Sequence, residues 1–178
     1  MSPPKAILVT GCSAGGIGAA IVSTLAKHDH HVFATARNTS KIPEELTSLP
    51  NATVLELDVS STAGYAAPVL DIDIAKAQRV YDVNVWGPVR TIQAFADLLI
   101  ASRGRIVNLS TVGSVVNTPW ISAYASSKAA LGNISETLRL ELSPFGVSVV
   151  IIMAGVVTSQ FHENDSPQPA SGLALRGY

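Results

Sequence analysis

The amino-acid sequence predicts an α/β fold in which a doubly wound parallel sheet lies between two layers of helices. Short apolar runs rich in Val, Ile and Leu alternate with longer segments of helical periodicity. The apolar runs lack the alternation of a strand that has one face in water, which indicates strands buried on both faces. Of the 178 residues, 47% are hydrophobic and 14% are charged, which excludes a largely disordered chain.

The pattern of runs and breaks sets the expected elements. Strands are expected over residues 5–10, 31–36, 53–59, 104–110 and 146–155. Helices are expected over residues 16–27, 71–83, 88–102 and 122–142. Pro88 suits the first position of a helix, and Pro144 stops the last one. We expect one domain over residues 1–162, followed by a flexible tail, 163–178, rich in Pro, Gly and Ser.

Composition excludes several classes of function. The net charge of −1 provides no basic surface for nucleic acid or an anionic membrane. The single cysteine, Cys12, allows no intramolecular disulfide, which is typical of a reducing compartment. No apolar signal stretch opens the chain, and the longest apolar run falls well short of the roughly 20 residues of a membrane-spanning helix. We therefore expect a cytoplasmic protein without an integral membrane segment.

The stretch TGCSAGGIG, from Thr10 to Gly18, joins the first expected strand to the first expected helix. In such a turn, free backbone N–H groups and the positive end of the helix face an anion, and glycines let a pyrophosphate approach closely. The alternative is a tight turn that binds nothing.

A second motif, Tyr124-Ala-Ser-Ser-Lys128, lies in the last expected helix. The i, i+4 spacing places the phenol and the ammonium on one helix face. A neighbouring cation favours the phenolate, so we expect Lys128 to lower the pKa of Tyr124 from its usual value of about 10. The pair would then exchange a proton near neutral pH. By itself the spacing also fits an exposed surface pair.

The order of several short motifs along the chain resembles that of the short-chain dehydrogenase/reductase family. These motifs are the glycine loop, LDV, AG, NVWG, a hydroxyl residue at a strand end, and YASSK. The resemblance covers residues 5–161 and implies a Rossmann-like sheet. Within the family, NVWGPVRTIQAF and SSKAALGNISETLRLELSPFGV are most similar to fungal NADPH-dependent 1-acyldihydroxyacetone-phosphate reductases and related hydroxysteroid or retinol reductases.

The resemblance implies a catalytic role for four residues. Tyr124 would protonate the carbonyl oxygen, while Lys128 would lower its pKa and hold the nicotinamide ribose. Asn84 would sit in a helix and hold a water of a proton relay. Thr111 stands where the family has serine, and its hydroxyl would orient the carbonyl. Ser110, one residue earlier, would face the other side of the strand.

The resemblance also implies a set of cofactor-binding residues, in which Asp58 would meet the adenine amino group. The set is Gly11, Ser13, Gly16, Ile17, Gly18, Arg37, Asp58, Tyr124, Lys128 and Val157. At the end of the second strand, a carboxylate would select NAD, but the chain has Ala36 followed by Arg37. A guanidinium suits a 2′-phosphate, so we predict NADP(H), with a solvated Arg37 as the alternative. We predict no metal site, because His28, His30 and His31 fall in a helix-to-strand turn.

The chain departs from the family pattern in three places. The glycine loop has one residue more than TGxxxGIG, and Gly15 is the candidate extra residue. Between Asp58 and Gly64 the chain lacks a helix and a strand, about 25 residues. That strand would lie beside the first strand, so either its neighbours close the gap or they keep unpaired backbone groups. After Gly155 the segment that covers the substrate is reduced.

Two functions remain open from the sequence. The leading one is an NADP(H)-dependent oxidoreductase that interconverts a ketone and a secondary alcohol on an apolar substrate, such as acyl-dihydroxyacetone phosphate, a steroid-like compound or a secondary-metabolite carbonyl. The alternative is a Rossmann-like protein without redox activity, acting as a partner subunit or a non-redox enzyme. The resemblance implies a homodimer or homotetramer formed through the helices over residues 88–102 and 122–142. It also implies association with the endoplasmic reticulum or lipid droplets as an alternative to a purely cytoplasmic location.

Overall fold

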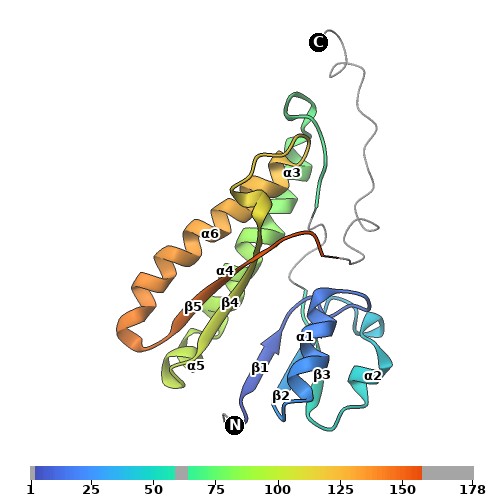
Figure 1. Cartoon of the computed structure of the whole chain (residues 1–178), viewed down its shortest axis with the longest axis vertical. Coiled ribbons are helices and arrows are strands. Elements are labelled where there is room, and N and C mark those ends of the chain that lie inside the picture. Colours follow the sequence, from blue (N-terminus) through green and yellow to red (C-terminus); the bar gives the residue numbers. More distant parts are fainter. Residues whose placement is uncertain (1–2, 59–63, 158–178) are drawn as a thin grey trace. The chain divides into compact units, whose positions relative to one another are not determined.

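The computed structural model describes residues 3–58 and 64–157, which divide into two compact units. Residues 3–58 belong to the first unit and residues 64–157 to the second. Figure 1 shows the helices and strands of each. Every strand pair in both units is parallel, so the predicted α/β class is confirmed.

The first unit is a three-stranded parallel sheet in the order β1-β2-β3. Its strands are β1 (Ala6–Val9), β2 (His31–Ala36) and β3 (Ala52–Glu56). Helix α1 (Ile17–Ala26) connects β1 to β2, and the short helix α2 (Glu44–Thr47) lies between β2 and β3. The predicted strand over residues 53–59 is shorter at its end than expected, and Val59 lies outside the described residues.

A single apolar core holds the first unit together. Val32 and Ala34 of β2 are fully buried and pack with Val22 of α1 and Leu46 of α2. Alternate residues of β2 therefore point at the helices, as the pleat of a strand requires. This packing fixes the carboxyl ends of the strands relative to the turn that follows β1.

The second unit begins with one long helical segment. Helix α3 (Ile74–Tyr81) continues through a π-helical turn, η3 (Asp82–Trp86), into α4 (Gly87–Ala94), and α5 (Ala96–Ala101) follows after a break at Phe95. Pro88 lies in the first turn of α4, as predicted, but no break separates α4 from α3, because η3 joins them.

The remainder of the second unit is a β-α-β segment. It contains β4 (Arg105–Thr111), α6 (Ser122–Leu142) and β5 (Ser148–Ala154), and the two strands are paired in parallel. Ile106 and Val149 are buried against apolar side chains of α4, α5 and α6. On the opposite face of the same strands, Val107, Val150 and Ile152 are exposed. Short 3-10 turns occur at Thr39–Lys41, Val69–Asp71, Val112–Ser114 and Ser143–Phe145.

The predicted single sheet is two sheets in the described residues. There β1 pairs with β2 alone, and β4 pairs with β5 alone. The first unit contains the three-stranded sheet β1-β2-β3, and the second unit contains the two-stranded sheet β4-β5.

Candidate cofactor loop and active-site residues

The glycine loop needs glycine at two positions for different reasons. Gly11 has a φ of +71°, a left-handed conformation that side chains with a Cβ disfavour. A Cβ on Gly18 would lie 2.5 Å from the Gly11 carbonyl oxygen, so the first turn of α1 packs directly on the backbone of the loop. The predicted extra residue, Gly15, also has a left-handed φ, of +70°, so the longer loop contains one additional sharp turn.

The loop is anchored to its own unit by backbone hydrogen bonds. The Cys12 N–H donates to the Thr35 carbonyl at 2.9 Å, and the Ala14 N–H donates to the Lys41 carbonyl at 2.8 Å. Cys12 is fully buried, its thiol donates to the Val9 carbonyl, and burial raises the pKa of this thiol. Cys12 therefore fills the loop and is not a reactive thiolate.

The start of α1 fits an anionic phosphate. Gly16 caps the helix without any side-chain bond to it, and the first turn contains no acidic residue. Ser13 accepts a hydrogen bond from the Gly16 N–H through its carbonyl, and Ile17 is the first helical residue. The N–H groups at this helix start and the glycine cradle would hold a pyrophosphate without a clash.

Arg37 and Asp58 lie at the same edge of the sheet as the loop. Arg37 is exposed and directly follows β2, which runs parallel to β1. The Leu57 N–H donates to the Ala36 carbonyl, so Asp58 follows β3 beside the end of β2. Asp58 is also exposed. The first unit thus gathers the residues predicted for the adenosine end of the cofactor.

Tyr124 and Lys128 lie one turn apart on α6 in the second unit. The Lys128 Nζ donates to the Leu109 carbonyl of β4 at 3.0 Å. Burial lowers the pKa of Lys128 and raises the pKa of Tyr124. The expectation that the lysine lowers the pKa of this tyrosine is therefore wrong, because burial shifts that pKa upward. Both groups are partly desolvated, and desolvation opposes the charged form of each.

Thr111 ends β4 next to this pair. Its Oγ1 accepts a hydrogen bond from the Gly113 N–H at 3.3 Å, and its side chain is half-buried. Ser110 is buried, and its hydroxyl lies 3.4 Å from the Lys128 carbonyl of α6. The two neighbouring hydroxyls therefore differ in environment, as strand alternation predicts.

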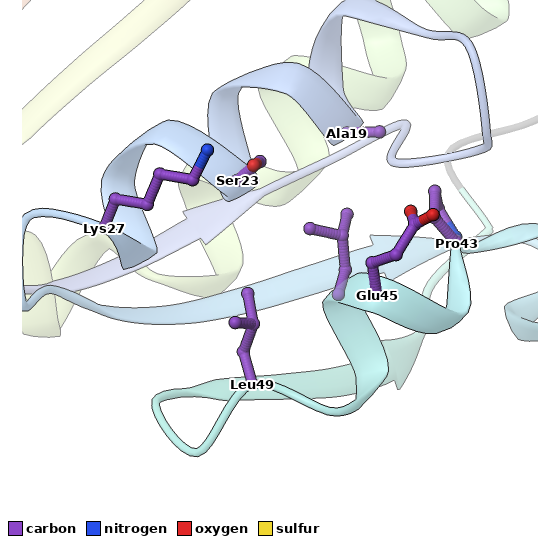
Figure 2. A pocket seen from close by; sticks show the side chains of 7 residues that line it. Ala19, Ser23, Lys27, Pro43, Glu45 and Leu49 are labelled. Carbon is purple, nitrogen blue, oxygen red and sulfur yellow. The ribbon is translucent and has the colours of Figure 1, made fainter.

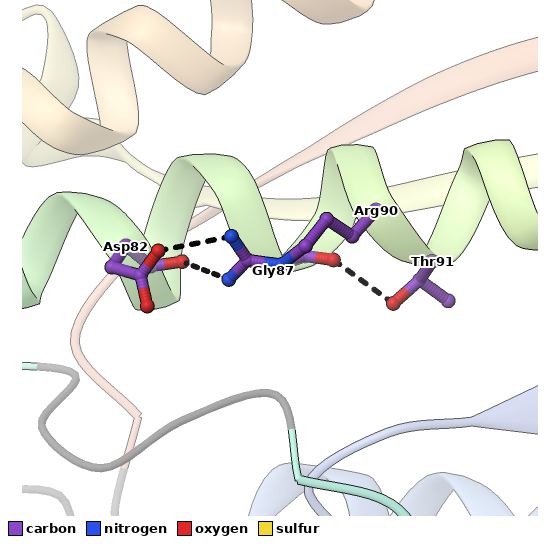
Figure 3. Close-up of polar contacts among 4 residues, drawn as sticks. All are labelled: Asp82, Gly87, Arg90 and Thr91. Atoms are coloured by element: carbon purple, nitrogen blue, oxygen red, sulfur yellow. Dashed lines mark hydrogen bonds and ion pairs between the residues drawn. The ribbon is translucent and has the colours of Figure 1, made fainter.

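Asn84 is buried within η3, and its Nδ2 donates to the Ser127 hydroxyl of α6 at 3.0 Å. The Gly87 N–H bonds to the Asp82 carbonyl, which closes the π-helical turn. Figure 3 shows that Arg90 reaches back across the turn, where its Nη1 donates to the Asp82 carboxylate at 3.0 Å and its Nη2 to the Asp82 carbonyl at 3.3 Å. Sequence reasoning predicted Asn84 on a helix but missed the π-helical turn.

The second unit thus brings together Asn84, Thr111, Tyr124 and Lys128 around the carboxyl end of β4. Val157, the remaining predicted residue, is exposed shortly after the end of β5. Ser127, which contacts Asn84, was not predicted as a site residue. Its only signal in the sequence is its place between Tyr124 and Lys128.

A separate cavity of about 460 Å³ lies between α1 and α2 (Figure 2). Leu46 and Leu49 are among the apolar residues that line it, and Lys27 and Glu45 are its charged lining residues. None of the predicted site residues lines it. No group of His, Cys, Asp and Glu side chains within residues 3–58 and 64–157 could hold a metal ion, and no helix there combines the length and apolarity needed to cross a bilayer.

Comparison with known proteins decides the family. The short chain dehydrogenase family model matches residues 5–69 and, in a second segment, residues 60–170. The chain belongs to the short-chain dehydrogenase family. Short-chain dehydrogenases are oxidoreductases that bind NAD or NADP, so the predicted enzyme class is confirmed.

Individual relatives are fungal. The chain is 40% identical over 191 residues to the short-chain dehydrogenase PC-15 of Penicillium crustosum. This alignment covers 93% of this chain and 70% of the relative. It is 35% identical over 184 residues to an NADPH-dependent 1-acyldihydroxyacetone phosphate reductase of Schizosaccharomyces pombe, covering 90% of this chain and 62% of that protein. The crystal structure of a short-chain dehydrogenase from Streptomyces avermitilis matches with a TM-score of 0.81 and 25% identity, covering 94% of this chain and 70% of that one.

The alignment lengths show that this short-chain dehydrogenase lacks internal residues that a relative has. An alignment of 191 residues is longer than the whole chain of 178, although it includes only 93% of the chain. The Penicillium relative therefore has residues inside the aligned region that this chain lacks. The two family-model segments overlap over residues 60–69, close to the place between Asp58 and Gly64 where a helix and a strand are expected from the sequence to be missing.

Proposed function

We propose that the chain is an NADP(H)-dependent oxidoreductase that interconverts a ketone and a secondary alcohol on an apolar substrate. The observation that carries this proposal is the grouping of a phenol, an ammonium, a hydroxyl and a buried amide at the carboxyl end of β4 in the second unit. Nothing in the described residues favours the non-redox alternative. The S. pombe relative is named as NADPH-dependent and as a reductase of a lipid-like ketone, which supports the same direction for this chain.

The bound nicotinamide would supply or accept the hydride. Tyr124 is the group that gives the proton to the carbonyl oxygen, because burial keeps its phenol protonated at neutral pH. Thr111 at the end of β4 presents a second hydroxyl that orients the carbonyl. Lys128, whose Nζ bonds to the Leu109 carbonyl, would hold the ribose hydroxyls of the nicotinamide half and would favour the phenolate of Tyr124 through its charge. Asn84 would hold the relay water.

The preference for NADPH rests on the first unit. Arg37 is exposed at the end of β2, and the residue before it, Ala36, offers no carboxylate to the ribose. A planar guanidinium forms paired hydrogen bonds with a phosphate, which favours the 2′-phosphate of NADPH over the ribose hydroxyl of NADH.

Self-association is proposed through the helices of the second unit. Leu98 of α5 and Leu140 of α6 are 66% and 65% exposed, while Leu99 and Leu138 of the same helices already pack on the core. Leucines exposed to this extent on both helices would be covered in a twofold dimer.

The test is a titration of the protein with NADPH and with NADH, followed by cofactor fluorescence. We compare the wild type with Arg37→Ala and with Lys5→Ala, which removes a charge at the opposite end of the same sheet. Arg37→Ala should weaken NADPH binding about tenfold or more and NADH binding less than about twofold. Lys5→Ala should change neither. Equal losses for both cofactors in Arg37→Ala would reject the proposed role of Arg37, and no binding of either would reject the function.

A further inference from the structure

Ser127 joins the turn that holds Asn84 to the turn that holds Tyr124. Asn84 Nδ2 donates to the Ser127 Oγ at 3.0 Å, and the Ser127 hydroxyl donates to the Tyr124 carbonyl at 2.7 Å. Ser127 is completely buried and Asn84 is 4% exposed. One buried side chain therefore accepts a hydrogen bond from η3 and donates one within α6.

Packing alone does not require a hydroxyl at this position. Positions 123, 125, 129 and 130 of the same helix are alanine, which is the better helix former. Alanine at position 127 would fill nearly the same volume. It would leave the Asn84 amide without one of its partners in a buried site, and a buried polar group that loses a partner is costly.

The bond from Ser127 to the Tyr124 carbonyl also acts on the helix itself. A serine that bonds back to a carbonyl of the preceding turn changes the local helix geometry. The carbonyl concerned belongs to Tyr124, and the next residue after Ser127 is Lys128. The direction of both side chains thus depends on the geometry of this one turn.

The same helix contains a matched pair away from this turn. Ser135, two turns later, is 1% exposed, accepts from Asn108 Nδ2 of β4 at 2.9 Å and donates to the Leu131 carbonyl at 2.7 Å. Ser135 thus has the burial of Ser127, accepts from an asparagine amide as Ser127 does, and also donates to a carbonyl of the preceding turn. Only the neighbours differ, because no residue of the proposed proton-transfer group contacts Ser135 in the described residues.

We propose that Ser127 is a positioning residue that holds the Asn84 turn against the Tyr124 turn of α6. This inference rests on the proposed function for its effect on turnover, but not for its effect on Tyr124 itself. Loss of the Ser127 hydroxyl should therefore alter the environment of Tyr124, whereas loss of the Ser135 hydroxyl should alter stability alone.

The experiment compares Ser127→Ala with Ser135→Ala by two measurements. In protein labelled with ¹³C in the tyrosine rings, and with the Tyr124 signal assigned from Tyr124→Phe, we follow the Tyr124 resonance through a pH titration. Ser127→Ala should shift this resonance and its midpoint, and Ser135→Ala should shift neither. In carbonyl reduction with NADPH, Ser127→Ala should lower kcat about tenfold with KM for NADPH unchanged, since small misplacements of a reacting group cost this much or more. Ser135→Ala should keep kcat within about twofold.

Each outcome decides a separate point. Equal shifts of the Tyr124 resonance in both variants, or none in either, would overturn the positioning role. A wild type without turnover would reject the proposed function while the resonance still tests Ser127. If Ser127→Ala does not fold, Asn84→Ala breaks the same bond from the donor side, with Asn108→Ala as its control. For this pair the Tyr124 resonance alone is the readout: it should shift in Asn84→Ala and not in Asn108→Ala.

Discussion

Tyr124 and Lys128 are one turn apart on α6, and burial raises the pKa of Tyr124 while it lowers the pKa of Lys128. We predict that Tyr124→Phe lowers turnover by about 100-fold or more, since a positioned proton donor contributes on this order. The affinity for NADPH should change little, because the ring that packs on the site is kept. Steady-state kinetics and cofactor titration check this, and a Phe variant with a near-normal rate would remove Tyr124 as the acid.

Lys128 predicts a pH dependence of stability. Folding lowers its pKa from the ordinary value of 10.5, so the unfolded chain binds the proton more tightly. Unfolding free energy therefore rises with pH between the folded-state pKa and 10.5, by at most about 1.4 kcal/mol per pH unit. Lys128→Met removes this gain.

Urea unfolding of the wild type and of Lys128→Met between about pH 7 and pH 10 measures the difference. The wild type should gain stability relative to the variant as the pH rises, since Tyr124 is present in both proteins and cancels. A difference that stays constant over this range would contradict a desolvated lysine.

Sequence reasoning at the residue scale found the types of the site residues but not their environments. The i, i+4 spacing placed Tyr124 and Lys128 on one helix, and it predicted a lowered pKa for the tyrosine because spacing indicates proximity. The sign of the shift depends on burial, which the spacing does not contain. The role of Ser127 was missed for the same reason, because its partner Asn84 is far away in sequence.

At the scale of elements, the packing of α1 on the glycine loop predicts contrasting effects of two glycine substitutions. Gly18→Ala places a Cβ 2.5 Å from the Gly11 carbonyl oxygen and should destabilise the first unit by about 2 kcal/mol. Gly132→Ala, within α6, meets no atom within 4 Å and should stabilise the protein by up to about 1 kcal/mol. Urea unfolding of both variants checks the pair, and destabilisation by both would show that the loop contact is not the cause.

Strands and long helices were predicted well, because their apolar periodicity extends over several residues. Helix α2 was missed because four residues are too few for periodicity, although Pro43 followed by Glu44 and Glu45 is typical of a helix start. Pro88 was interpreted as the first residue of a helix. The sequence around it fits that interpretation equally well, and only the packing of α3 and α4 as one segment favours the π-helical turn.

At the scale of the whole molecule, the two units have separate cores and separate sheets, so we predict that they unfold in separate transitions. Both tryptophans, Trp86 and Trp120, belong to the second unit. Tryptophan fluorescence therefore reports that unit alone, while far-UV circular dichroism reports both. The two urea curves should not coincide, and coincident curves would show one cooperative unit.

We predict that inserting the missing helix and strand would improve the stability and the activity of the chain. A helix and strand from a relative, inserted between Ser60 and Ser61, would supply a partner for β1 and β4. Thermal stability, NADPH affinity and turnover should all rise, and the two unfolding curves should merge. An inserted segment of scrambled sequence and equal length is the control. If the native insertion changes none of these quantities, the shortened centre has no effect on function.

Within residues 3–58 and 64–157, β1 and β4 are each paired with one strand, and this pairing has a consequence for hydrogen exchange with solvent. In a parallel strand, successive amides point to opposite neighbours, so every second N–H of a strand with one partner faces away from the ladder. Deuterium should therefore enter β4 at alternate residues, slowly on the side of β5 and fast on the other, whereas the middle strand β2 should resist exchange along its length. Deuterium uptake that alternates between successive residues would identify the edge strands of each sheet, without any measurement of cofactor binding or catalysis.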